Sequence, residues 1–156
     1  MAVIKKFRIK SFKEQETLLQ LDKISMFYDK RRILNDISFK VNRAEVLGLL
    51  GPNGVGKSTI FKIIMNIEQQ KSGKILLNGI DCTNLPIHER SNKFHLSYCP
   101  QYGGYFYDLT VFENLIAVSE IHIKNKNLRV SKIDKIIAQF GLDSILNVKA
   151  KNVSGG

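Results

Sequence analysis

The segment that most constrains the fold of this chain reads GPNGVGKS and occupies residues 51–58. Its glycines, lysine and serine match GxxxxGK[ST], the pattern of the P-loop. The apolar run Glu45 to Leu50 precedes it, and its composition is typical of a strand buried on both faces of a parallel or mixed central sheet. Isoleucines follow it at helical spacing: Ile60, Ile63, Ile64 and Ile67. The pattern therefore predicts a strand, a glycine-rich turn and an amphipathic helix.

The chemistry of a polyphosphate explains why these residue types stand together. A phosphate chain must be wrapped at close range, and Gly54 and Gly56 leave the backbone amides free to point inward. The following helix adds the partial positive charge of its N-terminus. We expect Lys57 to reach the β and γ phosphates, Ser58 to offer a hydroxyl to Mg²⁺, and Thr59 to lie beside the α phosphate.

The nucleotide-binding residues predicted for this loop are Gly51, Pro52, Asn53, Gly54, Val55, Gly56, Lys57, Ser58 and Thr59. The alternative is a glycine-rich turn that binds no nucleotide. The strand before the loop and the helix after it favour the phosphate site.

The first hundred residues otherwise show strand patterns. Leu19, Leu21 and Ile24 indicate one strand, and Ile37, Phe39 and Val41 alternate with polar residues in a second. Asn78-Gly79 predicts a tight hairpin turn between Lys74–Leu77 and Ile80. Residues 96–99 are a further short strand candidate, ended by Pro100.

The last third of the chain shows helical patterns instead. Thr110 is a candidate N-cap for a helix over residues 111–118. Ser131 is expected to begin a second helix, with Asp134 at its third position and Gly141 as its stop. One face of that helix would be apolar, formed by Ile133, Ile136, Ile137 and Phe140. The sequence therefore predicts an α/β fold, with a sheet core followed by a helical subdomain.

Composition and charge narrow the class of protein. Residues 1–17 look like a basic extension without the apolar core of a signal peptide, and no apolar run reaches the roughly 18 residues that span a bilayer. A cytoplasmic location is expected. The net charge of +10 allows a nucleic acid or an anionic membrane surface as partner, or reflects a lysine-rich composition with solvated charges. No RNP or zinc-finger pattern favours nucleic acid.

Residues 51–59 resemble the P-loop of the ABC transporter ATPases, which commonly reads GPNGxGKST. Cys99-Pro100-Gln101 resembles the Q-loop of that family, whose glutamine binds magnesium, helps to position the attacking water and senses the membrane partner. Tyr28 matches the family's aromatic residue that stacks on adenine, although a packed core tyrosine is the alternative. Ala44 stands where the family usually has glycine, at a turn that could require a positive φ.

Val153-Ser154-Gly155-Gly156 resembles the signature motif of the same family, usually LSGGQ. In the family this motif contacts the γ phosphate of ATP held by the opposite subunit. The resemblance therefore implies a head-to-tail homodimer, with Ser154, Gly155 and Gly156 among the nucleotide contacts.

The resemblance covers about residues 18–156. It implies a P-loop NTPase of the ABC type, with a helical subdomain at about 102–153, that binds ATP and Mg²⁺. Lys57 and Gln101 would be the catalytic residues, and Ser58 and Gln101 the magnesium ligands. Within the family, residues 96–115, LGLLGPNG at 47–54 and LPIHER at 85–90 are most similar to the ATP-binding proteins of lipopolysaccharide export.

That similarity implies integral membrane subunits as partners, docking near residues 102–112, and a peripheral location on the cytoplasmic face of the inner membrane. Tyr105, Phe106 and Tyr107 would form an exposed docking patch. The alternative for these aromatics is a packed contact between the sheet core and the helical subdomain. Direct binding to nucleic acid is not expected.

The sequence contains no Asp-Glu dipeptide, which in the family ends the Walker B strand with a magnesium-binding Asp and a catalytic Glu. None of the three histidines matches the family's switch histidine. We therefore expect the N-terminal part of a subunit, truncated at the signature motif. Two alternatives remain: a nucleotide-binding remnant without turnover, and an ABC protein that acts on nucleic acid.

Overall fold

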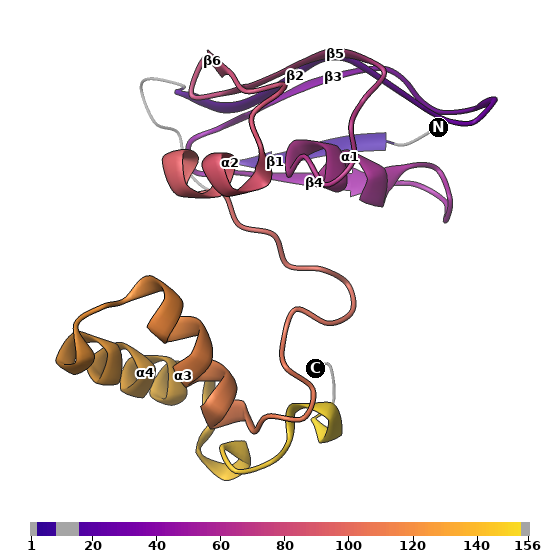
Figure 1. Cartoon of the computed structure of the whole chain (residues 1–156). Helices are drawn as coiled ribbons and strands as arrows, with labels where there is room; N and C mark the ends of the chain where they lie inside the picture. The colour runs from indigo at the N-terminus through magenta and orange to yellow at the C-terminus, as the bar shows by residue number, and fades with distance from the viewer. Residues whose placement is uncertain (1–2, 9–15, 154–156) are drawn as a thin grey trace. The chain divides into compact units, whose positions relative to one another are not determined.

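The computed structural model describes residues 3–8 and 16–153, and the chain divides into two compact units, residues 1–98 and 99–156 (Figure 1). The first unit contains all six strands of the described residues, together with two helices. The described residues of the second unit form helices and no strand.

The main sheet of the first unit has four antiparallel strands in the order β3-β2-β5-β6. The predicted hairpin is confirmed, because Asn78 and Gly79 both adopt the positive φ (50° and 76°) that such a turn requires. The two strands predicted early in the chain are also confirmed, and both are longer than their apolar patterns. The strands are β2 (Thr17–Tyr28), β3 (Arg31–Asn42), β5 (Ser72–Leu77) and β6 (Ile80–Asp81).

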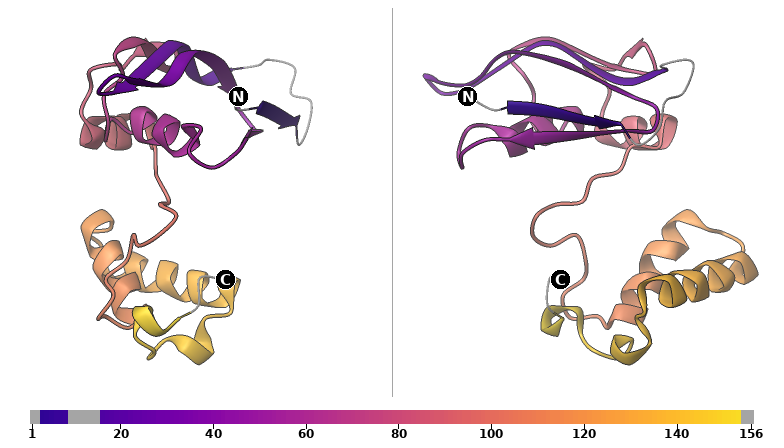
Figure 2. Two further views of the ribbon diagram at one scale, coloured as in Figure 1. Left: turned by 90° about the vertical axis from the view of Figure 1, so that its right-hand side faces the viewer. Right: turned by 180° about the vertical axis from the view of Figure 1, so that it is seen from behind.

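A second layer covers one face of this sheet (Figures 1 and 2). It holds a two-stranded antiparallel sheet and two helices, and the hydrophobic core lies between the layers. Leu21, Ile24 and Ile75 of the main sheet meet Ile60 and Ile63 of the first helix there, all at most 1% exposed. The elements of this layer are β1 (Val3–Arg8), β4 (Glu45–Leu50), α1 (Lys57–Ile64) and α2 (Ile87–Phe94).

The prediction for the P-loop strand is wrong in part. β4 forms as expected, but its partner in the described chain is β1, antiparallel, from Val3 opposite Leu50 to Arg8 opposite Glu45. Val46 and Leu50 are about half exposed, while Leu47 and Leu49 pack on the core, so only one face is buried. β1 lies within the segment predicted as a basic extension, where Lys5-Lys6 interrupts any period-2 pattern.

Two further predictions in this unit are corrected. The helix α1 ends at Ile64, and Asn66 turns the chain with a φ of 57°, so Ile67 lies beyond the helix and is half exposed. Residues 95–100 have no regular structure and form no strand. A short apolar run becomes a strand only where a neighbouring strand offers backbone partners. The turn before β4 does require a positive φ, which Ala44 adopts at 57°.

The second unit is built on a helix pair, α3 (Val111–His122) and α4 (Lys126–Phe140), followed by two short 3₁₀ turns, η1 (Asp143–Ile145) and η2 (Ala150–Asn152). Thr110 caps α3, as predicted, and its side chain forms a complete capping box with Glu113, which was not predicted. The start predicted for α4 is wrong: Asn125 caps it, and Ser131 lies inside it. Gly141 ends it with a φ of 62°, as predicted.

The predicted apolar face of α4 is only partly buried. Ile133 and Ile137 are buried, whereas Ile136 and Phe140 are exposed. The two buried positions are four residues apart and lie on the same side of the helix. The stripe that packs within this unit is therefore narrower than the sequence pattern indicated.

Arg90 connects α1 to the rest of the first unit. It is fully buried in α2, and burial lowers the pKa of its guanidinium. Its Nη1 donates to the carbonyl oxygens of Ile63 (2.9 Å) and Ile64 (2.6 Å), the last two residues of α1. Its Nε and Nη2 donate to Leu85 O (2.9 Å) and Thr83 O (2.8 Å). One side chain therefore caps the end of α1 and fixes the turn that follows β6.

We expect the substitution Arg90→Met to lower the free energy of unfolding by about 3 kcal/mol, because four hydrogen bonds are lost and the carbonyl groups of Ile64 and Thr83 keep no other donor among the described residues. Arg90→Lys keeps a cation that can reach only some of these acceptors and should lie between wild type and Arg90→Met. Urea denaturation of the full chain measures both. A wild-type midpoint for Arg90→Met would contradict this role.

Candidate nucleotide-binding site

The P-loop joins β4 to α1 through a turn that depends on two glycines. Gly54 and Gly56 have φ values of 77° and 97°, in the left-handed region that favours glycine. Gly56 is the N-cap of α1, and its carbonyl accepts from Ile60 N at 3.1 Å. Within the described chain no side chain caps this helix end, and its first turn has no acidic residue. The N-terminal amides and their partial positive charge are therefore available to an anion.

Gly56 also packs against strand β3. A Cβ atom at this position would lie 2.8 Å from Leu34 Cδ2, 3.2 Å from Ile33 Cγ2 and 3.3 Å from Ile33 O. At Gly54 a Cβ atom would meet nothing within 4 Å. Gly54 therefore provides only backbone freedom, whereas Gly56 also lets the loop lie directly on the sheet.

The Lys57 side chain folds back over the loop. Its Nζ donates to the carbonyl oxygens of Gly51 (2.7 Å) and Pro52 (2.6 Å). Ser58 is exposed and Thr59 is buried beside it. The Lys57 ammonium group, the Ser58 hydroxyl and the N-terminal amides of α1 thus all belong to one short segment, residues 51–59. This set of donors fits a polyphosphate with a divalent cation.

Tyr28 lies at the end of β2, and 44% of it is exposed. Its hydroxyl donates to the Glu68 carboxylate, and this hydrogen bond raises the pKa of the hydroxyl. A weaker interaction with the hydroxyl of Thr59 lowers that pKa. The structure thereby brings the Tyr28 hydroxyl close to Thr59 of α1, and the base-stacking role of Tyr28 stays a prediction. The sequence predicted no role for Glu68, because a single glutamate in a loop matches no motif.

The other predicted site residues belong to the second unit. Gln101 is exposed, and its Nε2 donates to the Tyr102 hydroxyl at 3.4 Å. Its magnesium contact stays a prediction. The signature residues Ser154, Gly155 and Gly156 lie outside the described residues, so their nucleotide contacts stay predictions as well.

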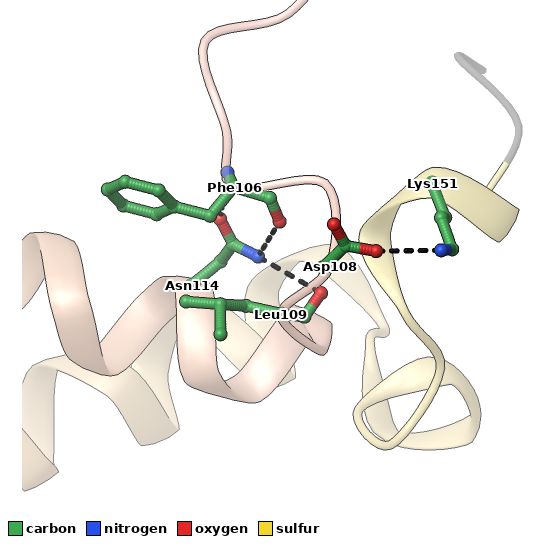
Figure 3. A network of polar contacts seen from close by, with 5 residues as sticks. All are labelled: Phe106, Asp108, Leu109, Asn114 and Lys151. Atoms are coloured by element: carbon green, nitrogen blue, oxygen red, sulfur yellow. Dashed lines mark hydrogen bonds and ion pairs between the residues drawn. The ribbon is translucent and has the colours of Figure 1, made fainter.

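The segment 102–109, which we call the aromatic loop, is exposed, and hydrogen bonds hold its C-terminal part to the rest of the unit. Tyr102, Tyr105, Phe106 and Tyr107 range from 45% to 83% exposed. Asn114 binds the loop from α3: its Oδ1 accepts from Phe106 N (2.7 Å), and its Nδ2 donates to the carbonyl oxygens of Phe106 (3.0 Å) and Leu109 (3.4 Å) (Figure 3). The same Nδ2 donates to Thr110 O at 2.9 Å. Sequence reasoning missed this role.

A second contact joins the loop to the η2 segment. Lys151 Nζ lies 2.7 Å from Asp108 Oδ1 (Figure 3), and Lys151 N donates to Tyr107 O at 3.1 Å. The Lys151 ammonium lowers the pKa of the Asp108 carboxyl. The C-terminal part of the loop, residues 106–109, is therefore held by α3 on one side and by the η2 segment on the other.

Comparison with known proteins identifies the family. The model of the ABC transporter family matches residues 34–156. The chain belongs to this family. The fold agrees, since a solved ATP-binding cassette of an ABC transporter superposes with a TM-score of 0.71, at 23% identity, over 89% of this chain and 60% of that one.

Curated relatives of this ABC chain include the lipopolysaccharide export system ATP-binding protein of Haemophilus influenzae, 38% identical over 90% of this chain and 58% of the relative. The protein of the same name from Escherichia coli K12 is 33% identical over 83% of this chain and 54% of the relative. An uncharacterised ABC transporter ATP-binding protein of Rhizobium meliloti is 38% identical over 83% of this chain. The ABC chain thus spans little more than half the length of the first two relatives.

The described part of the ABC chain contains no helix that is long and apolar enough to cross a membrane. This agrees with the absence of a long apolar run in the sequence.

The two P-loop glycines provide a matched pair of substitutions. Both Gly54→Ala and Gly56→Ala place a Cβ on a positive-φ residue, which costs about 1 kcal/mol, but only Gly56→Ala also collides with Leu34 and Ile33. We expect Gly56→Ala to lower both the melting temperature and the affinity for Mg-ATP more than Gly54→Ala does. Calorimetric melting and a nucleotide titration measure the two effects. Equal losses for the pair would show that the contact with β3 is unimportant.

Asn114→Ala should free the backbone of the aromatic loop. We expect the Phe106 amide to exchange its hydrogen at least about tenfold faster, because its acceptor is removed. Asn114→Asp should not preserve the slow exchange of the loop, since a carboxylate would face the three carbonyl oxygens to which the Asn114 amide donates. Hydrogen-exchange mass spectrometry measures this, with the exposed Asn127→Ala on α4 as control. Unchanged exchange at Phe106 would refute the assignment.

Proposed function

We propose that this chain binds ATP with Mg²⁺ as the ATP-binding subunit of an ABC transporter, and that the transporter exports lipopolysaccharide. The observation that carries the nucleotide site is the P-loop itself: Lys57 directed onto the loop backbone at the uncapped N-terminus of α1. The Haemophilus and Escherichia relatives support the choice of transported substrate.

Each site residue has a defined task in this proposal. The amides of the loop and of the first turn of α1 bind phosphate oxygens, and Lys57 exchanges its two carbonyl partners for the β and γ phosphates. The Ser58 hydroxyl and Gln101 supply oxygen ligands to Mg²⁺, and Tyr28 stacks on the base. Mg²⁺ neutralises phosphate charge when it is bound. Ser154, Gly155 and Gly156 would complete the site of the opposite subunit in a homodimer.

The second unit is proposed as the helical subdomain and as the docking region for the integral membrane subunits. The exposed aromatic side chains of residues 102–112 support this, since exposed aromatics are enriched where proteins bind one another. In this proposal the subunit lies peripherally on the cytoplasmic face of the inner membrane.

The substitution Lys57→Ala tests the nucleotide site. We expect the affinity of the chain for Mg-ATP to fall about 10- to 100-fold, because a charge-assisted contact to phosphate is worth about 1.5–3 kcal/mol. Titration of a fluorescent ATP analogue in the presence of Mg²⁺ measures the change. Lys40→Ala, at an exposed lysine of β3, is the matched control and should bind like wild type. Equal affinities for wild type and Lys57→Ala would overturn the proposal.

A further inference from the structure

Three side chains form a network behind the nucleotide site that no sequence motif indicates. The Tyr28 hydroxyl donates to Glu68 Oε2, and Lys62 Nζ donates to Glu68 Oε1 at 2.7 Å. Each carboxylate oxygen therefore has its own donor. The Glu68 side chain is 21% exposed and that of Lys62 41% exposed, so the carboxylate is the more protected member.

The backbone after α1 places Glu68 for this contact. Asn66 reverses the chain in the left-handed region, and the amides of Ile67 and Glu68 then return to the Lys62 carbonyl at 2.8 Å and 3.4 Å. Lys62 thus holds Glu68 twice, by its main chain and by its ammonium group. A carboxylate held in this way is a fixed acceptor and not a mobile surface charge.

Charge strengthens the contact to the tyrosine. The hydrogen bond from Lys62, followed by that from Tyr28, lowers the pKa of the Glu68 carboxyl, so Glu68 is ionised at neutral pH. The same contact raises the pKa of the Tyr28 hydroxyl, which therefore keeps the proton that it donates. A hydroxyl that donates to a charged carboxylate forms one of the stronger hydrogen bonds in proteins.

Tyr28 needs such an anchor, because packing alone leaves it loosely held. It lies beside the tip of the β2–β3 hairpin, directly before Asp29, whose φ of 51° turns the chain, and 44% of it is exposed. A ring has two side-chain torsions, and a hydrogen bond at its far end restricts both. The anchor lies at the hydroxyl, and 44% of the residue remains exposed.

We propose that Glu68 is a positioning residue that, held by Lys62, sets the Tyr28 ring for stacking on the base of the nucleotide. This inference rests on the proposed function of Tyr28. It links the end of the P-loop helix to base recognition: α1 binds phosphates at its N-terminus and orients the base-stacking ring from its C-terminal side. Glu68 itself touches no nucleotide in this proposal.

The test distinguishes binding of the base from binding of the phosphates. The affinities of the full chain for Mg-ATP and for inorganic tripolyphosphate with Mg²⁺ are measured by calorimetry in wild type and in Glu68→Ala. Stacking of the base on an aromatic side chain contributes to affinity, and loss of orientation should remove part of that contribution, so we expect ATP affinity to fall about 5-fold. Tripolyphosphate affinity should stay within about 2-fold, since it has no base.

Two further variants show whether Glu68 acts through the tyrosine. Tyr28→Phe keeps the ring and removes the anchored hydroxyl, so it should weaken ATP binding by a similar factor. The double variant Tyr28→Phe with Glu68→Ala should add no further loss, because both changes remove one contact. Glu68→Gln keeps an acceptor and should recover part of the affinity. Glu89→Ala, an exposed glutamate on α2, is the control for lost negative charge.

Failure of the positioning role and failure of the proposed function would give different results. Equal loss of ATP and tripolyphosphate affinity in Glu68→Ala, or additive losses in the double variant, would overturn the positioning role while leaving the phosphate site intact in wild type. Unchanged ATP affinity in Glu68→Ala would overturn it as well. A wild-type chain that binds neither ligand would refute the proposed function, and this inference with it.

Discussion

Four carbonyl groups converge on the guanidinium of Arg90, and the position of the P-loop helix depends on that contact. The helix has only eight residues, too few to be stable alone, and among the described residues Arg90 is the only donor to its last carbonyl, that of Ile64. A buried arginine satisfies this carbonyl and supplies positive charge at the negative end of the helix dipole. Because Arg90 also binds the turn after β6, the hairpin and the helix are fixed as one piece.

The two ends of α1 therefore differ in how their free backbone groups are capped. Its C-terminal end is capped by Arg90, and the turn beyond it is fixed by Lys62 and Glu68. Its N-terminal end has no side-chain cap among the described residues, and Gly56 seats it directly on β3. A short helix fixed at one end and open at the other presents its free amides at a defined place. That arrangement is what a phosphate-binding loop requires.

In the second unit, side chains that lie outside the aromatic loop fix its backbone in a similar way. Asn114 uses both the donor and the acceptor of its amide on the loop backbone, and Lys151 holds the opposite side. The loop backbone thus needs no packing of its own aromatic rings to stay in place. Tyr105 and Tyr107 contact each other, with ring centroids 4.9 Å apart, and remain half exposed. Rigid exposed aromatics lose little entropy when a partner covers them.

Features that depend on a few neighbouring residues could be predicted from the sequence: the P-loop turn, the helix that follows it, the Asn78-Gly79 hairpin and the Thr110 cap. Each follows from a local φ requirement or a local hydrogen bond. The pairing of β4 with β1, the burial of one face of β4, the lack of a strand at residues 95–100, and the contacts by which Arg90, Glu68 and Asn114 hold the site and the loop are evident only in the folded chain. Those outcomes depend on which distant backbone groups lie within hydrogen-bonding reach, and no pattern of nearby residues encodes that.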